Sequence, residues 1–202
     1  MSTLQQLQSH LKQGHLYRRS DVAEWSKSPD RHLAALVKAG TLEKVSQGLY
    51  YYPRPSVFGN TPPEESKLVQ RFLKDDRFLI TSPNAYNSLG VGTTQLYNQR
   101  VVYNHKRHGD FTLGHRRFAF RVKPHFPTRL TEEFLLVDLL NNIDAVAEDK
   151  EAVLERVKNK VPTMDAQKLA RAVKDYGGLR ARKFFTPLLK KHSNGRRVPA
   201  SA

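Results

Sequence analysis

The sequence predicts an α+β protein built from two domains. Three helical patterns and a hairpin pattern occupy the first 59 residues, strand patterns dominate residues 81–126, and helical periodicity returns from Thr131. With 39% hydrophobic and 26% charged residues in a chain of 202, the composition is that of a folded protein. Disorder throughout the chain is therefore excluded.

The first two helices are expected to be short. Leu4, Leu7 and Leu11 recur at spacings of three and four residues, and Gly14 follows them as a stop. Ser20 is expected to cap the second helix, because a serine oxygen can accept a hydrogen bond from a free backbone N–H group of the first turn.

The third helix has the clearest signals at both of its ends. Ser28 can serve as N-cap, Pro29 suits the first helical position, and Gly40 tolerates the positive φ that often follows a last turn. Its apolar stripe is expected to comprise Leu33, Leu36 and Val37.

A β-hairpin is predicted over residues 42–52. β-Branched and aromatic residues flank a turn of Ser46, Gln47 and Gly48 there. Three short helices followed by a hairpin are the element order of a winged helix-turn-helix.

Breaks in the pattern after this hairpin predict a domain boundary. The residues that interrupt regular structure are Pro53, Pro55, Gly59, Pro62 and Pro63. We therefore expect a winged helix-turn-helix domain over residues 1–59 and a mixed α+β C-terminal domain with a helical end over residues 60–202.

The second domain is expected to open with a helix over residues 64–74. Strands are expected at 100–103 and 116–123, and the helix from Thr131 is so apolar that it should form the buried centre of the domain. The remaining helices are predicted over residues 148–160, 164–176 and 179–191.

The charge of the chain points to its partners. Its 34 Lys and Arg exceed its 19 Asp and Glu, which gives a formal net charge of +15 at pH 7. Such an excess favours nucleic acid, or less often an anionic membrane or an acidic protein. The distribution is uneven: residues 131–155 are strongly acidic, whereas residues 156–202 hold thirteen basic side chains against two acidic ones.

Several classes of protein are excluded by what the sequence lacks. The chain has no cysteine, which excludes disulfides, thiolate metal sites and cysteine nucleophiles. No apolar run approaches the roughly 18 residues that a membrane span needs, and the first residues lack the features of a signal peptide. We expect a cytoplasmic protein without a membrane partner.

The candidate DNA-reading surface is the polar side of the third helix. At about 100° per residue, this side is expected to carry Ser28, Arg31, Ala35 and Lys38. Arg31 is the first candidate for a base contact, because a guanidinium can bind two acceptors of guanine, and Ala35 is small enough to approach a thymine methyl group.

Phosphate contacts would position this helix on DNA. Lys27, Ser28 and Lys38 are the candidates beside the helix, and Lys44, Gln47 and Arg54, on or after the hairpin, could follow the neighbouring backbone or the minor groove. The alternative interpretation is a structural or protein-binding domain whose charged face is merely solvated.

Four runs of the sequence carry a family resemblance. Three lie in the first domain, RSDV at 19–22, RHLAALVKAGTLEKV at 31–45 and QGLYY at 47–51, and the fourth is SPNAYNSLG at 82–90. Together they resemble the AbiEi-type family of antitoxins and transcriptional regulators.

The resemblance implies a bacterial toxin–antitoxin system of two genes. A member of the family binds inverted repeats in its own promoter and represses it, while its C-terminal domain opposes a nucleotidyltransferase-like toxin encoded beside it. On this resemblance, the partners of the chain would be double-stranded DNA and the cognate toxin.

A second basic surface is predicted on the strand at 116–123. Strand alternation would place Arg117, Ala119, Arg121 and Lys123 on one face, opposite Phe118, Phe120 and Val122. The basic face could extend a DNA footprint or contact an acidic partner, and the alternative is an ordinary solvated strand face.

The last helices add further basic residues to this prediction. They carry Lys168, Arg171, Lys174, Arg180, Arg182 and Lys183. Such a surface could hold DNA phosphates, RNA or an acidic face of the toxin. It could equally pair with the acidic segment of the same chain.

Enzymatic interpretations have little support in the sequence. No phosphate loop, dinucleotide fingerprint, nucleophile elbow or His-Glu-x-x-His motif occurs. His105, His108 and Asp110 could ligate a divalent ion only if they converged in space, so no metal or other cofactor is expected. Asp138, alone on an apolar helix, is expected to be a buried, hydrogen-bonded carboxylate and not a catalytic acid.

The sequence therefore predicts a DNA-binding repressor that acts as an antitoxin and has no catalytic activity. The alternatives are a nucleic-acid-processing enzyme such as a metal-dependent nuclease, and an RNA-binding adaptor.

Overall fold

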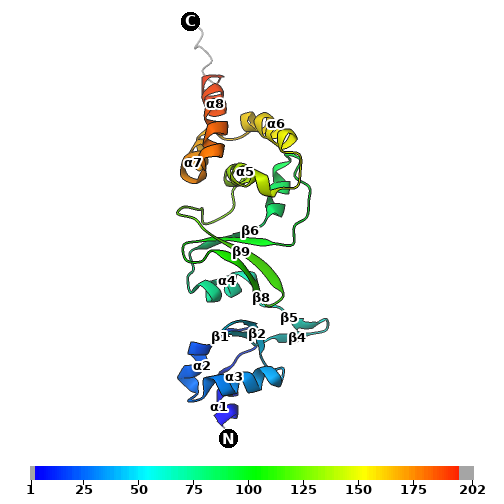
Figure 1. The fold of residues 1–202 in the computed structure, drawn as a ribbon, viewed down its shortest axis with the longest axis vertical. Coiled ribbons are helices and arrows are strands. Elements are labelled where there is room, and N and C mark those ends of the chain that lie inside the picture. The colour runs from blue at the N-terminus through cyan, green and yellow to red at the C-terminus, as the bar shows by residue number, and fades with distance from the viewer. Residues whose placement is uncertain (1–2, 196–202) are drawn as a thin grey trace. The chain divides into compact units, whose positions relative to one another are not determined.

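The computed structural model describes residues 3–195 and has a mixed α+β fold, as predicted (Figure 1). The chain packs as two compact units. The first contains the residues up to Phe78 together with Gly109–Phe118, and the second contains Leu79–His108 together with the residues from Ala119 on. The predicted domains, residues 1–59 and 60–202, were assigned by function and not by packing, so they stay a prediction.

The first unit begins with the three predicted helices, α1 (Thr3–His10), α2 (Arg19–Trp25) and α3 (Pro29–Lys38). They share a core with the chain that follows them, formed by the buried side chains of Leu7, Leu11, Tyr17, Val22, Leu33, Leu36 and Leu42. The leucine spacing that predicted these helices therefore marks the side chains that hold them together.

The predicted cap of α2 is wrong. The helix begins at Arg19 with Arg18 as its N-cap residue, so Ser20 already lies inside the first turn. The backbone N–H of Arg18 donates to the carboxylate of Asp21 at 3.0 Å. An acidic side chain three residues into the helix thus satisfies the N–H group of the cap residue, as in a capping box.

The predicted hairpin is present in a three-stranded antiparallel sheet. Its strands are β2 (Glu43–Ser46) and β3 (Leu49–Tyr51), and the turn uses Gly48 at φ +68°. A strand that the sequence analysis did not predict, β1 (Leu16–Arg18), pairs with the other side of β3, so the order is β1-β3-β2.

A second hairpin occupies the segment that was expected to be irregular. Strands β4 (Arg54–Ser56) and β5 (Gly59–Thr61) form a separate two-stranded ribbon. Val57 and Phe58 at its turn are 93% and 98% exposed. The amide of Asn60 donates to the carboxylate of Glu43 at 2.9 Å and joins the ribbon to β2.

The remaining strands form a four-stranded sheet. They are β6 (Phe78–Thr81), β7 (Arg100–Asn104), β8 (Gly109–Leu113) and β9 (Arg116–Val122), in the order β6-β7-β9-β8. The predicted strands correspond to β7 and β9. The predicted helix at 64–74 is α4 (Glu65–Leu73), which belongs to the first unit.

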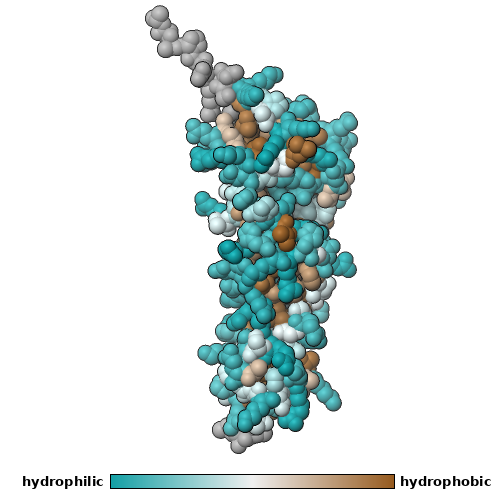
Figure 2. Space-filling view, turned by 60° about the vertical axis from the view of Figure 1, so that its left-hand side comes forward, coloured by the Kyte–Doolittle hydropathy of each residue, from teal (hydrophilic) through white to brown (hydrophobic). Residues whose placement is uncertain are grey.

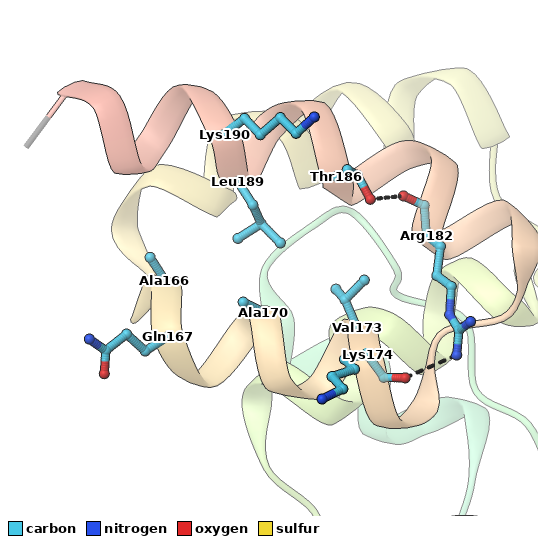
Figure 3. Close-up of a pocket in the computed structure, with 9 residues that line it drawn as sticks. All are labelled: Ala166, Gln167, Ala170, Val173, Lys174, Arg182, Thr186, Leu189 and Lys190. Atoms are coloured by element: carbon cyan, nitrogen blue, oxygen red, sulfur yellow. Dashed lines mark hydrogen bonds between the residues drawn. The ribbon is translucent and has the colours of Figure 1, made fainter.

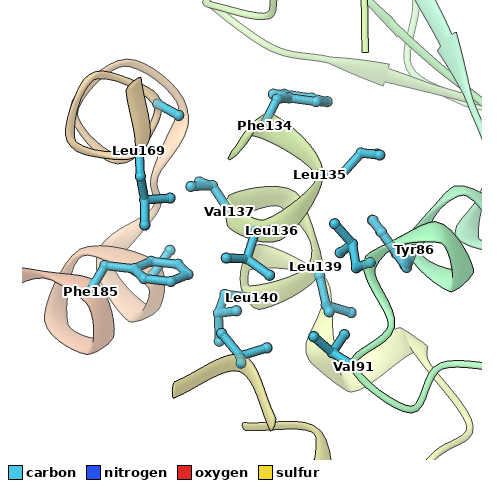
Figure 4. Packing of buried hydrophobic residues seen from close by; sticks show 14 of the residues in the cluster. Tyr86, Val91, Phe134, Leu135, Leu136, Val137, Leu139, Leu140, Leu169 and Phe185 are labelled. Carbon is cyan, nitrogen blue, oxygen red and sulfur yellow. The ribbon is translucent and has the colours of Figure 1, made fainter. Parts of the chain in front are cut away.

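The second unit is organised around α5 (Glu132–Asn141), which lies among α6 (Lys150–Lys160), α7 (Ala166–Tyr176) and α8 (Leu179–Gly195) in Figure 1. Thr131 caps this helix by accepting the N–H of Phe134 at 3.2 Å. Every residue from Phe134 to Leu140 is buried, which confirms the predicted centre. Leu169 and Phe185 pack on one side of α5, and Tyr86 on another (Figure 4).

The other helices of the second unit agree with the predicted pattern. They are α6 (Lys150–Lys160), α7 (Ala166–Tyr176) and α8 (Leu179–Gly195), with short 3-10 helices η1 (Pro83–Leu89), η2 (Ile143–Ala145) and η3 (Val161–Thr163) between the main elements.

The face of the molecule in Figure 2 is largely hydrophilic. On the face in Figure 2, hydrophobic side chains are visible only in separate patches. Within residues 3–195, no helix is both long enough and apolar enough to cross a membrane.

Candidate nucleic-acid interface

Helix α3 presents its predicted polar side to solvent. Arg31, Ala35 and Lys38 are exposed, whereas Leu33 and Leu36 are buried in the core of the first unit. Helix α3 is therefore divided into two sides, as predicted. These three exposed residues, about one turn apart, form what we call the α3 face, and the opposite side of the helix is fixed by packing.

The turn before α3 is held by a residue that the sequence analysis did not single out. The hydroxyl of Ser26 accepts the backbone N–H of Ser28 at 3.0 Å and lies 2.8 Å from Nδ1 of the buried His32. Ser28 occupies the N-cap position as predicted, but its side chain makes no capping bond. Lys27 is exposed in this turn, so Ser26 fixes the backbone from which Lys27 and Ser28 project.

An ion pair neutralises the acidic residue beside Arg31. Nε and Nη2 of Arg19 donate to the two carboxylate oxygens of Asp30 at 2.7 and 2.6 Å. The hydrogen bond from Arg19 lowers the pKa of Asp30 below its usual value, so Asp30 stays charged and paired at neutral pH. The pair is exposed and adds little to stability. Asp30 is therefore not a free carboxylate beside the cations of the α3 face.

The predicted contacts on the hairpins fall into two groups. Lys44 on β2 and Gln47 in the turn are exposed. Arg54 on β4 is also exposed, but its guanidinium lies over Gly14, whose φ is +81°, and its Nε donates to the carbonyl of Gln13 at 3.3 Å. A Cβ at position 14 would lie 2.4 Å from that Nε, so Arg54 has a structural role besides any contact with phosphate.

The predicted basic strand face is wrong in its details. Ala119 is buried and Val122 is 46% exposed. Arg121 and Lys123 are half-buried, and not exposed, beside a cavity of the second unit. Both faces of β9 are covered around Phe118, Ala119 and Phe120, so strict alternation between a core face and a solvent face does not hold. Arg117 is exposed, as predicted.

Two of the predicted basic residues, together with Lys190, border a groove of about 790 Å³ between α7 and α8 (Figure 3). Lys174 and Arg182 line it together with apolar side chains such as Val173 and Leu189. Arg182 donates to the backbone carbonyl of Lys174 at 2.9 Å. The remaining predicted residues Lys168, Arg171 and Lys183 are exposed.

One of the predicted basic residues, Arg180, pairs with the acidic segment of the same chain. Arg180 donates to a carboxylate oxygen of Asp144 at 2.6 Å, and Lys150 donates to the other oxygen at 2.7 Å. The hydrogen bond from Lys150, followed by that from Arg180, lowers the pKa of Asp144. Arg180 thus has an acidic partner within its own unit.

Asp138 is a buried, hydrogen-bonded carboxylate, as predicted. The hydroxyls of Tyr86 and Tyr103 each donate to it at 2.8 Å, and the amide of Asn142 donates at 3.1 Å. Burial raises the pKa of Asp138, which these hydrogen bonds and the charge of Lys123 oppose. The two tyrosines and Asn142 were not among the predicted functional residues, because nothing in their spacing indicates that they share one carboxylate.

The histidines considered as metal ligands do not assemble a site. His105 stacks on Phe126 with ring centroids 4.7 Å apart. Among the side chains that the structure describes, no group of three or more His, Cys, Asp and Glu lies close enough to hold a metal ion.

Comparison with known proteins identifies a structural likeness. Neither the protein-family models nor the curated proteins include a match to this chain. Among solved structures, the chain is similar to the crystal structure of the RV2827C protein from Mycobacterium tuberculosis, with a TM-score of 0.57 and 14% sequence identity. The match covers 94% of this chain and 75% of that one. At this identity, the likeness concerns the fold alone.

Proposed function

We propose that the chain is a DNA-binding transcriptional repressor whose first unit reads DNA through a winged helix-turn-helix. The observation that carries the proposal is the α3 face, on which Arg31, Ala35 and Lys38 are all exposed. Helix α2 packs against α3, and the β2–β3 hairpin supplies Lys44 and Gln47 as a wing. This arrangement supports insertion of α3 into the major groove, with the hairpin beside it.

Each residue of the interface has a different role in this proposal. The guanidinium of Arg31 donates two hydrogen bonds to O6 and N7 of a guanine, and Ala35 contacts a thymine methyl group. Lys27, Ser28, Lys38, Lys44, Gln47 and Arg54 bind phosphates or sugars and fix the position of α3 without reading sequence.

The proposal is tested by binding of the chain to the DNA upstream of its own gene. We expect Arg31→Ala to weaken binding by about 1–3 kcal/mol and to relax the preference at one base pair. Fluorescence anisotropy with the operator and with single-base variants measures both effects. Arg129→Ala is the matched control, because it removes the same exposed side chain outside the proposed interface.

Two outcomes would contradict the assignment. Retention of full affinity and full base preference by Arg31→Ala would show that α3 does not read the bases. Equal losses in Arg31→Ala and Arg129→Ala would show that only the net charge of the chain matters.

We further propose that this repressor is the antitoxin of an AbiE-like system in the bacterial cytoplasm and that it opposes a nucleotidyltransferase-like toxin. The support is the resemblance of residues 19–22, 31–45, 47–51 and 82–90 to that family. Co-expression with the product of the neighbouring open reading frame tests it. Rescue of growth is the expected result, and failure to rescue leaves only the repressor.

The proposed function includes no catalysis. Incubation of the chain with DNA and RNA in the presence of Mg²⁺ or Mn²⁺ should leave both polymers intact. Cleavage that disappears in His105→Ala or His108→Ala would favour a metal-dependent nuclease instead.

A further inference from the structure

The second unit contains a cavity of about 360 Å³ that DNA reading does not use. It lies beside η1, β7, β9 and the end of α5, and its lining includes Tyr86, Tyr97, Tyr103, Arg121, Lys123 and Asn142. We call it the tyrosine cavity. Its volume falls within the range of roughly 300–1,000 Å³ that is typical of sites for small molecules.

The aromatic wall of the tyrosine cavity is held in place by hydrogen bonds behind it. Tyr86 and Tyr103 both donate to Asp138, which is 2% exposed and does not itself line the cavity. The hydroxyl of Tyr97 accepts the backbone N–H of Ala147 at 2.8 Å. Three rings are therefore fixed before any ligand arrives, which lowers the entropy cost of binding a planar group against them.

The basic side chains in the lining of the tyrosine cavity suit an anion. Arg121 and Lys123 belong to its lining, with His108 as a third basic side chain, and no Asp or Glu is found among the described residues that line it. The ammonium of Lys123 lies 5.2 Å from the centroid of the Tyr103 ring. Such a contact is worth only about 0.5–1 kcal/mol at a solvent-accessible site, whereas an ion-paired hydrogen bond with an anion is stronger.

From these features we propose that the tyrosine cavity binds a small aromatic anion, a planar ring that carries a phosphate or a carboxylate group. The ring packs against the tyrosine side chains, and the acidic group is bound by Arg121 and Lys123. Asp138 is a positioning residue, since it orients two of the rings and does not contact the ligand. This site is independent of the α3 face, so its test requires no DNA.

The two sources of the acidic group are separated by the choice of probes. Adenosine monophosphate represents ring phosphates and salicylate represents ring carboxylates, while adenosine and inorganic phosphate each supply half of the proposed ligand. Titration calorimetry on the full chain should show one site for at least one of the two anions. Each half alone should bind at least about tenfold more weakly, because it lacks either the stacking or the charge-assisted hydrogen bonds.

Variants of β9 and the residue after it test the basic side of the cavity. We expect Arg121→Gln and Lys123→Gln each to weaken binding of the anion by about tenfold or more. Arg117→Gln is the matched control, because it removes the same charge as Arg121→Gln from an exposed position of the same strand that does not line the cavity. Thermal unfolding of each variant verifies that it is folded.

A second measurement on the unmodified protein does not depend on the variants. In a chain with isotope-labelled tyrosine, the anion should shift the ring resonances of Tyr86, Tyr97 and Tyr103, whereas Tyr50 and Tyr52 of the first unit should not move. The proposal is overturned if neither anion binds at millimolar concentration, if adenosine binds as tightly as its monophosphate, or if Arg117→Gln loses as much affinity as the two cavity variants. It is also overturned if the three tyrosine resonances stay unchanged at saturation.

Discussion

At the residue scale, the two sites differ in what fixes their side chains. Arg31 projects from a helix whose other side is buried, so its backbone is positioned by the core of the first unit. Two tyrosines of the cavity, Tyr86 and Tyr103, are instead positioned by one buried carboxylate. The first arrangement can be recognised from apolar spacing, whereas the second depends on residues 35 and 52 positions from Asp138.

Removal of the Asp138 carboxylate should destabilise the second unit. Asp138→Ala leaves the hydroxyls of Tyr86 and Tyr103 and the amide of Asn142 without their acceptor, so we expect a loss of about 3 kcal/mol or more in the free energy of unfolding. Asp138→Asn keeps an acceptor and most of the volume, and it should cost much less. Urea unfolding followed by circular dichroism measures both variants, and equal losses would contradict the hydrogen-bonding account.

The raised pKa of Asp138 also predicts a pH dependence. Between its usual pKa of 3.8 and its raised pKa, Asp138 keeps its proton in the folded protein and releases it in the unfolded chain. The contribution of this group to stability therefore falls as the pH rises through the raised pKa. The difference in unfolding free energy between the wild type and Asp138→Asn should therefore decrease from about pH 4 upward and then level off. A difference that stays constant or increases over this range would contradict the prediction.

Phe58 lies at the turn of the β4–β5 ribbon. Because it is 98% exposed, Phe58→Ser should change the free energy of unfolding by no more than about 0.5 kcal/mol. If the β4–β5 ribbon inserts this apolar side chain at a base step, the same change should weaken operator binding, and Phe58→Leu should weaken it less. Unchanged affinity in Phe58→Ser would remove the ribbon from the interface.

At the element scale, α3 and α5 were predictable and the β4–β5 ribbon was not. Both helices carry dense apolar spacing, and α3 has the predicted N-cap residue, Ser28. Pro55 made the ribbon look irregular. Proline is nevertheless tolerated in edge strands, and both strands of a two-stranded ribbon are edges.

Two other elements show where local sequence stops being informative. Strand β1 has only three residues, which is too short for alternation to be detected, and its pairing with β3 joins positions more than thirty residues apart. The alternation of β9 was present in the sequence but misleading, because packing on both of its faces buries Ala119 as well as Phe118 and Phe120.

Lys27 before α3 and Lys38 at its end should contribute to the salt dependence of DNA binding. About six phosphate contacts imply a slope near −5 in a plot of log affinity against log salt concentration. The double variant Lys27→Ala, Lys38→Ala should reduce the magnitude of this slope by about 2 while leaving the base preference unchanged. A slope that stays the same would place the phosphate contacts elsewhere.

At the scale of the whole molecule, the excess positive charge is divided between the two units. The α3 face accounts for a small part of it, and the groove between α7 and α8 carries Lys174 and Arg182 in the second unit. We therefore expect the second basic surface to serve a partner other than the operator.

Reversal of one charge on this groove should separate the two activities. We expect Lys174→Glu to retain operator affinity but to lose rescue in co-expression, because an opposed charge in an interface costs several kcal/mol. Lys158→Glu on α6, which is also exposed and does not line the groove, should retain both activities. Loss of operator affinity in Lys174→Glu alone would assign the groove to DNA.

Each unit is assembled from two separate stretches of the chain, with boundaries after Phe78, His108 and Phe118. A single genetic crossover at any position therefore leaves at least one unit with parts from both parents, and replacement of the entire first unit requires three breakpoints. On the proposed function, the preference for an operator and the preference for a partner would be inherited together, and a new pairing of the two would arise more readily by substitutions on the surfaces than by exchange of whole units.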